Sequence, residues 1–313
     1  MTIKRVAAAG ITAAALALSA CGTSSGGNAG PQVVASFYPF AYVAQQIGGP
    51  DLDVQNLTSP GMEPHDLELK PKQVGSIIDA DLVIYEKDFQ AAVDTAVDQA
   101  DRDERNLVDT AEVVDILTPA EEEAGHASDG HAEGDGHDHG AIDPHIWLDP
   151  LNMDKIADAV TAKLVALHPD KASTYEANSA TFKTALSALD ASYRTGLATC
   201  ETREIVTSHA AFAYLANRYG LHQIAIAGID PSNEPSPAQL ADITDHVKRN
   251  KITTVFTEEL VSPAVAKTVA NATGASLATL DPIEGLGKDA SDQTYLTLMK
   301  RNLTALMKAN RCT

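Results

Sequence analysis

Three histidines in this sequence lie in short segments whose residue types suit metal binding. Their surroundings are GMEPH (61–65), DPHIW (143–147) and TSH (207–209), which hold His65, His145 and His209. Each lies in a loop or just after a predicted strand, where α/β proteins gather ligands at the carboxyl edge of a parallel sheet. Asp281 follows the last predicted strand in the same way. Because imidazoles and a carboxylate suit a borderline metal ion, these four side chains predict a metal site in a cleft between two lobes.

This interpretation depends on the three histidines together, since any one of them alone fits a structural or surface role better than a ligand role. Glu63 is a further acidic candidate, either as a ligand or as a group that orients a ligand histidine through its second ring nitrogen. Three other histidines stand apart from these segments and are interpreted as surface or structural residues: His168, His222 and His246.

Residues 121–143 differ from the rest of the chain in composition. The segment reads EEEAGHASDGHAEGDGHDHGAID, with four histidines among acidic residues and glycines. It has almost nothing apolar to bury, so we expect a solvated loop. Its histidines predict an auxiliary, low-affinity metal collector, and the alternative is an acidic loop whose histidines are incidental. They are His126, His131, His137 and His139.

The elements that must position these residues alternate between short apolar runs and amphipathic helical patterns. The strand candidates are 33–37, 54–57, 82–85, 204–207, 223–227, 254–257 and 277–280. This alternation predicts an α/β fold with parallel sheets flanked by helices. Residues 170–199 lack proline, and a helix of that length would reach about 45 Å. We therefore expect an N-terminal lobe (32–168), a rigid linking helix (169–199) and a C-terminal lobe (200–313).

The net charge of the chain argues against some classes of binding partner. Lys and Arg number 23 against 43 Asp and Glu, which gives a formal net charge of -20 over 313 residues. A field of that sign repels phosphate backbones and anionic lipid headgroups, so we expect no nucleic-acid partner and no electrostatic membrane binding. It favours cationic ligands.

The first residues have the pattern of an export signal. Lys4 and Arg5 precede an apolar run over 6–17 that is too short to span a bilayer, and LSAC (18–21) follows. This resembles a bacterial lipobox, which predicts a signal peptide over 1–20, a lipid anchor on Cys21 and a flexible tether through residue 31. The alternative is an ordinary secretory signal with a chance cysteine. We expect an extracytoplasmic protein, bound to the membrane only through its lipid.

Two cysteines remain, Cys200 and Cys312. In an oxidising compartment we expect them to form a disulfide, rather than free thiols or metal thiolates, because neither lies in a C-x-x-C pattern or beside a histidine. The loop-entropy relation assigns such a bridge roughly 4 to 5 kcal/mol.

Several motifs, in this order, resemble a known family. They are ASFYP (35–39), G-x-x-PH (61–65) with Pro71, DPHIWLDP (143–150), TSHAAFAYL (207–215), EPSP (234–237), FTE (256–258), TGA (273–275), LDP (280–282) and YL-x-LM (295–299). Together they cover nearly the whole chain after the leader. The sequence resembles the metal-binding substrate-binding proteins of bacterial ABC importers, in their zinc-specific, ZnuA-like group.

The resemblance implies two lobes around four-stranded sheets, bridged by one long helix, with a metal ion held between the lobes. It implies His65, His145 and His209 as ligands, with Asp281 at the position of an acidic fourth ligand that water or a nearby glutamate replaces in some members. A His-rich acidic loop before the second ligand and a disulfide in the second lobe are also typical. The implied partners are the membrane permease of a zinc importer and a zinc donor or metallochaperone at the loop, with the protein itself a monomer.

Ligand chemistry favours Zn²⁺ as the bound ion. Three imidazoles and a carboxylate suit tetrahedral zinc, although copper or nickel would also accept imidazoles. Manganese members of the family resemble this chain but place a glutamate where His209 stands. The alternatives to zinc capture are import of manganese or another divalent metal, a surface adhesin, and a zinc hydrolase. Because the chain after residue 31 lacks H-E-x-x-H and G-x-S-x-G, we expect no enzyme.

Overall fold

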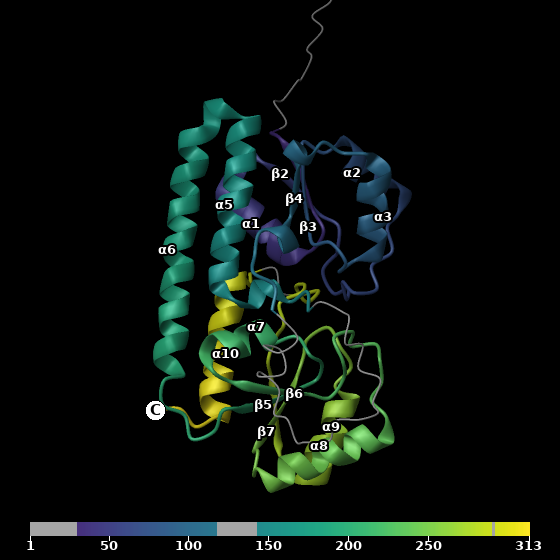
Figure 1. Ribbon diagram of the computed structural model, residues 1–313, viewed down its shortest axis with the longest axis vertical. Helices are drawn as coiled ribbons and strands as arrows, with labels where there is room; N and C mark the ends of the chain where they lie inside the picture. Colours follow the sequence, from purple (N-terminus) through teal and green to yellow (C-terminus); the bar gives the residue numbers. More distant parts are fainter. Residues whose placement is uncertain (1–29, 118–142, 290–291) are drawn as a thin grey trace, which may run out of the picture.

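The computed structural model describes residues 30–117, 143–289 and 292–313. Within them, two α/β lobes lie one above the other beside a set of long helices (Figure 1). The leader with Cys21 and the four histidines of the 121–143 segment fall outside the described residues. No helix within the described ranges is both long and apolar enough to cross a membrane.

The first lobe is built on a sheet of four parallel strands in the order β2-β1-β3-β4. Its elements are β1 (Gln32–Ala35), α1 (Tyr38–Gly48), β2 (Asp53–Asn56), α2 (Pro71–Asp79), β3 (Leu82–Tyr85), α3 (Ala91–Ala100) and β4 (Leu107–Asp109). The sequence pattern missed β4, because three residues are too few to show an alternation. Its pairing with β3 supplies the backbone partners that the pattern alone does not reveal.

The second lobe repeats this order, since its parallel strands run β6-β5-β7-β8. Its elements are β5 (Glu204–Thr207), α7 (Ala213–Tyr219), β6 (His222–Ala225), α8 (Pro237–Arg249), β7 (Thr254–Thr257), α9 (Ala264–Thr273) and β8 (Ser276–Thr279). The predicted α/β fold with two four-stranded parallel sheets is therefore confirmed.

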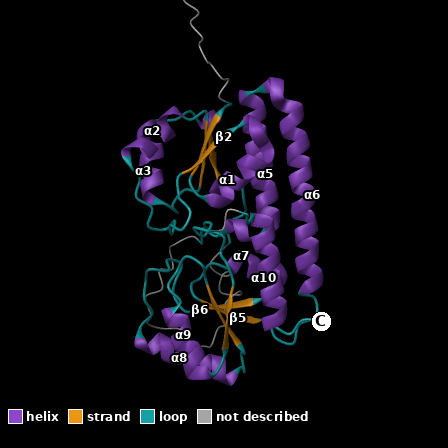
Figure 2. Ribbon diagram, turned by 180° about the vertical axis from the view of Figure 1, so that it is seen from behind, coloured by secondary structure: helices purple, strands orange, loops and turns teal. Residues whose placement is uncertain are grey.

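Three long helices line one side of both lobes: α5 (Pro150–Leu167), α6 (Ala172–Gly196) and α10 (Tyr295–Ala309) (Figure 2). Helix α6 begins after the 3₁₀ turn Pro169–Lys171 and packs on α1 and α5 above and on α10 below. Its buried side chains recur at three and four positions, which turns one apolar stripe toward both lobes: Tyr175, Ser179, Phe182, Leu186, Leu189 and Tyr193. The prediction of one long helix is confirmed.

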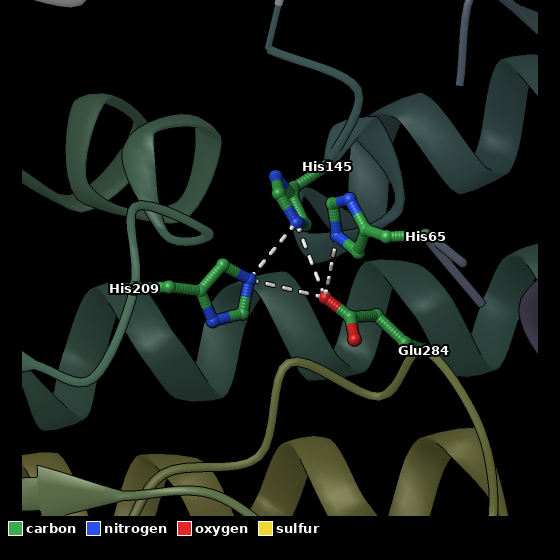
Figure 3. Close-up of side chains that lie close together, drawn as sticks. All are labelled: His65, His145, His209 and Glu284. Atoms are coloured by element: carbon green, nitrogen blue, oxygen red, sulfur yellow. Dashed lines mark hydrogen bonds and ion pairs between the residues drawn. The ribbon is translucent and has the colours of Figure 1, made fainter. Parts of the chain in front are cut away.

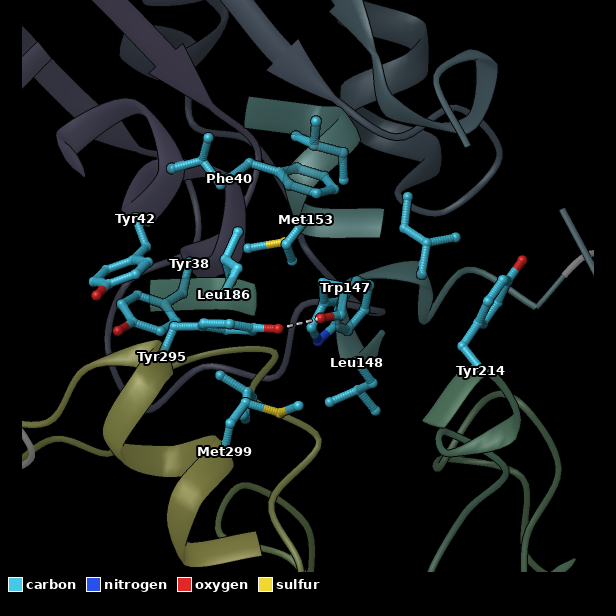
Figure 4. Close-up of a cluster of buried hydrophobic side chains, with 14 of the residues drawn as sticks. Tyr38, Phe40, Tyr42, Trp147, Leu148, Met153, Leu186, Tyr214, Tyr295 and Met299 are labelled. Carbon is cyan, nitrogen blue, oxygen red and sulfur yellow. Dashed lines mark hydrogen bonds between the residues drawn. The ribbon is translucent and has the colours of Figure 1, made fainter. Parts of the chain in front are cut away.

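Each sheet is covered on both faces, which explains its continuous apolar strands. Adjacent residues alternate between faces, so Val33 packs toward the long helices while Val34 packs toward α2 and α3. In the second sheet, Val206 and Val255 face α8 and α9. The faces toward the long helices join into one hydrophobic core that spans both lobes (Figure 4). Because this core is shared, the loops between the two sheets are held in a fixed arrangement.

A disulfide joins Cys200, just after α6, to Cys312 at the C-terminus. Beside it, the backbone N–H of Thr313 donates to the carbonyl oxygen of Thr199 at 2.9 Å. The bridge thus ties the end of α10 to the end of α6, at the point where the chain enters the second lobe.

Candidate metal centre

Four side chains from four separate segments meet between the lobes: His65, His145, His209 and Glu284 (Figure 3). His65 lies in the loop between β2 and α2, and His145 precedes the 3₁₀ turn Ile146–Leu148 that leads into α5. His209 follows β5, and Glu284 follows β8. The predicted histidines are therefore brought together, and the acidic partner beside them is Glu284.

The spacing of the donor atoms suits a small tetrahedral ion. Nε2 of His145 lies 3.3 Å from Nε2 of His209, and each of these atoms lies 3.2 Å from Oε1 of Glu284. Nε2 of His65 lies 3.5 Å from the same oxygen. Ligands about 2.0–2.1 Å from a tetrahedral zinc ion lie about 3.3 Å from one another. These four separations are close to the edges of such a tetrahedron, and all four donor atoms lie within 4.8 Å of one another.

Two of the imidazoles are fixed from behind by carboxylates. Nδ1 of His145 lies 2.6 Å from Oδ1 of Asp143, and Nδ1 of His209 lies 2.8 Å from Oε2 of Glu258. The backbone N–H of each histidine also donates to the same carboxylate. With Nδ1–H donated to the carboxylate, the lone pair on Nε2 points into the cluster, which is the arrangement that metal-binding histidines use.

His65 is held differently. Among the described residues its imidazole has one carboxylate partner within 4.0 Å, Glu284 at Nε2, and its ring packs edge-on against Phe89 with centroids 4.8 Å apart. Its side chain is 8% exposed, whereas those of His145, His209 and Glu284 are 0–1% exposed. The cluster is therefore nearest to solvent at His65.

The electrostatics of the cluster favour bound positive charge. Desolvation lowers the pKa of His145 and of His209, but the neighbouring carboxylates outweigh it, so both pKa values are raised. Desolvation would raise the pKa of Glu284, yet its interactions with the imidazoles of His145, His209 and His65 outweigh this effect and hold that pKa well below its usual value. A buried, ionised carboxylate among three imidazoles is a set that a divalent cation completes.

Asp281, the predicted fourth ligand, is not among the four side chains that meet in this structure. Its carboxylate accepts a hydrogen bond from the backbone N–H of Ile283 at 2.8 Å, and its own backbone is bonded to Asn302. Burial raises its pKa to about 6. Asp281 therefore shapes the turn after β8 and lies outside the group of ligand atoms.

The turn after β8 places Glu284 in the cluster, and the sequence analysis did not identify this residue. Ile283 has a φ of 59°, a left-handed conformation that is strained for a β-branched residue. The reversal carries the next side chain back toward the histidines. An aspartate followed by proline signals the turn, but no sequence pattern shows which acidic residue after it faces inward.

The segments that carry His145 and Glu284 are tied together across the lobes. The indole Nε1–H of Trp147 donates to the carbonyl oxygen of Pro282 at 2.7 Å, and the hydroxyl of Tyr295 donates to the carbonyl of Trp147 at 2.7 Å (Figure 4). Both hydrogen bonds are buried. These bonds fix the register of the two ligand segments.

Glu63 lies beside the cluster and is not one of its ligand atoms. Burial and the neighbouring Glu284 carboxylate raise the pKa of Glu63 to about 8. Because two close carboxyl groups do not both ionise readily, the Glu284 carboxylate disfavours ionisation of Glu63.

The other three histidines of the described residues lie away from the cluster. His246 is buried on α8, with Nε2 3.2 Å from Glu204 and 2.8 Å from the side-chain amide of Asn250. His168 follows α5, and His222 is exposed on β6. Their placement fits a structural or surface role.

Comparisons with known proteins identify the family to which the chain belongs. The model of the family "zinc-uptake complex component A periplasmic" matches residues 33–309. The chain belongs to this family. Its resemblance to the ZnuA-like group is confirmed.

Among curated relatives, the zinc-binding lipoprotein AdcA of Streptococcus pneumoniae is 36% identical over 298 residues, covering 93% of this chain. The chain spans 58% of the length of AdcA. The high-affinity zinc uptake system protein ZnuA of Bacillus subtilis is 37% identical over 305 residues, which cover 95% of this chain and 94% of that protein.

Solved structures agree with this assignment. The Zn(II)-bound ZnuA-like domain of S. pneumoniae AdcA is 33% identical with a TM-score of 0.74, covering 90% of this chain and 99% of that domain. The laminin-binding protein Lmb of Streptococcus agalactiae, described as having adhesin and metal-transporting activity, is 30% identical with a TM-score of 0.76, covering 90% of this chain and 99% of Lmb.

Proposed function

We propose that this member of the zinc-uptake family captures Zn²⁺ outside the cytoplasm and delivers it to the membrane permease of an ABC importer. The observation that carries the proposal is the convergence of His65, His145, His209 and Glu284, from both lobes, at the spacing of a tetrahedral zinc site. Three nitrogens and one oxygen suit zinc better than manganese, which prefers oxygen ligands.

Capture without catalysis fits the same geometry. A catalytic zinc site keeps one coordination position open for water or substrate. Here four protein side chains would hold the ion, and the two carboxylates behind the cluster, Asp143 and Glu258, are engaged by imidazoles. Neither is placed as a general base for a bound water.

We further propose roles for the segments that lie outside the described residues and for the partners. Cys21 would carry the lipid anchor after removal of residues 1–20, and the tether to residue 31 would let the lobes reach a permease. The histidines of the 121–143 segment would supply zinc or accept it from a donor. The segment ends at Asp143, whose carboxylate contacts Nδ1 of His145 at 2.6 Å, which supports a path for transfer. The protein would act as a monomer.

The test is a competitive chelator titration of the chain from Gly22 onward with zinc and with manganese. We expect one tight zinc site, poor filling by manganese, and loss of the tight site in His209→Ala. His222→Ala, which removes an exposed histidine of the same lobe, serves as the matched control and should keep the site. Weak binding spread over several equivalent sites would contradict the proposal.

His209→Glu tests metal choice at the same position. An oxygen in place of this nitrogen should raise the preference for manganese relative to zinc. An unchanged ratio of the two affinities would show that His209 does not set selectivity.

A further inference from the structure

Three arginines line a hollow of about 280 Å³ where the end of α6 meets α7, away from the metal centre. They are Arg194, Arg203 and Arg218, and the lining is completed by Tyr193, Leu197, Ala198 and Tyr219. The chain has only nine arginines, in a protein of net charge -20. A third of the arginines therefore lie around one concave surface, although the protein as a whole is acidic.

Two of these guanidinium groups are held by carboxylates that lie deeper than they do. Nε and Nη2 of Arg218 bond to Oδ2 of Asp149 at 2.8 and 2.5 Å, and Nε of Arg194 bonds to Oδ2 of Asp190 at 2.8 Å. The arginine side chains are 33% and 55% exposed, against 5% and 13% for their carboxylate partners. The acids therefore anchor the guanidinium groups from the protein side and leave outer N–H groups accessible.

Arg203 has no carboxylate partner within 4.0 Å in the part of the chain that the structure describes. Its guanidinium donates to two backbone carbonyls instead, those of Ala198 at 2.9 Å and Tyr219 at 3.4 Å. Three guanidinium groups against two carboxylates leave one positive charge at the hollow. Carbonyl bonds orient Arg203 without neutralising it.

The walls are rigid. The rings of Tyr193 and Tyr219 stack with centroids 4.8 Å apart, and the Tyr219 hydroxyl donates to Oδ1 of Asp190 at 3.2 Å. Arg218 also joins the two lobes, because Asp149 is the N-cap residue of α5. Pre-oriented guanidinium forks in a rigid hollow bind oxyanions with little loss of side-chain entropy.

We propose that this hollow binds a small anion with carboxylate or phosphate oxygens, held by Arg203 and by the outer N–H groups of Arg194 and Arg218. The ligand class follows from the planar, bidentate fit between guanidinium and such oxyanions. The site is independent of the zinc ligands and of the proposed zinc function.

Calorimetric titration of the zinc-loaded chain from Gly22 onward at low ionic strength tests the proposal. The probes are inorganic phosphate and succinate, which distinguish phosphate from carboxylate recognition. We expect one saturable site for at least one probe, weakened about tenfold or more in Arg203→Gln. Arg194→Gln should weaken it as well.

Arg105→Gln is the matched control, since Arg105 is an exposed first-lobe arginine paired with Asp103. It should leave anion binding unchanged, and all three variants should keep zinc stoichiometry, which reports on folding. No saturable binding of either probe up to about 10 mM, or an equal loss in Arg105→Gln, would overturn the proposal.

Discussion

His145 and His209 differ from His65 in the group that contacts Nδ1 of the imidazole. The first two have a buried carboxylate on Nδ1, from Asp143 and Glu258, and both rings are fully buried. His65 has neither feature and depends on its loop, which is joined to the second lobe where the N–H of Gly61 donates to the carbonyl of Leu286 at 2.7 Å. The site therefore consists of a preformed part, His145, His209 and Glu284, and a fourth ligand placed by a loop.

Removal of ligands should show this difference most strongly. His209→Ala should lower zinc affinity on the order of a thousandfold or more, since groups behind the ligands alone are worth 10–100-fold. His65→Ala should cost less, because the preformed part remains intact. Equilibrium competition with a chelator measures both, and equal losses would show that the two kinds of ligand are equivalent.

Replacement of the acids in the turn after β8 separates ligand from scaffold. Glu284→Gln removes the only charged ligand, and we expect about a hundredfold loss of zinc affinity. Asp281→Asn keeps an oxygen that accepts from the N–H of Ile283, so affinity should change by less than about threefold. The reverse order in the same chelator assay would restore Asp281 as the ligand.

The carboxylates behind the preformed part should have an intermediate effect. Glu258→Gln and Asp143→Asn keep an acceptor for Nδ1–H but remove its charge, so each should weaken zinc binding by about 10–100-fold. Isothermal titration of each variant, with zinc stoichiometry as the control for folding, measures this. An unchanged affinity would show that these carboxylates serve packing alone.

The pH dependence follows from the same carboxylates. Zinc needs neutral imidazoles, and the raised pKa values of His145 and His209 mean that protons compete from a higher pH. Zinc affinity should therefore fall as the pH drops, with the fall beginning above the reference value of about 6.5. Glu258→Gln removes the main cause that raises the pKa of His209, so its fall should begin at lower pH. Flat affinity between about pH 7.5 and about 5.5 would contradict the three-histidine assignment.

Deletion of residues 121–140 should have the smallest effect on the folded site. None of the four ligands lies in this segment, so the affinity of the tight site should stay within about threefold, while weaker additional sites disappear. Zinc titration of the deletion variant against the intact chain checks this. A loss as large as that of His209→Ala would make the segment the principal site.

The sequence by itself determined much of this protein. Strand-sized apolar runs separated by helical periods predicted the two sheets and the long helix, and the local segments around His65, His145 and His209 singled out the three histidines. These features are local: alternation, periodicity and residue type lie within a few positions of one another. Of the eight strands in the part of the chain that the structure describes, β4 alone was not predicted, because its three residues are too few to show such a pattern.

The tertiary structure alone decided the fourth member of the cluster and the groups behind the histidines. Asp281 and Glu284 are three residues apart, and what separates a turn-forming acid from an inward-facing one is the left-handed conformation of Ile283 and the bond from Trp147 to Pro282. Trp147 and Pro282 are 135 residues apart in the chain. The Glu258 that holds His209 is likewise 49 residues away from it. Contacts of such range arise when two lobes pack around one shared core, and no local pattern encodes them.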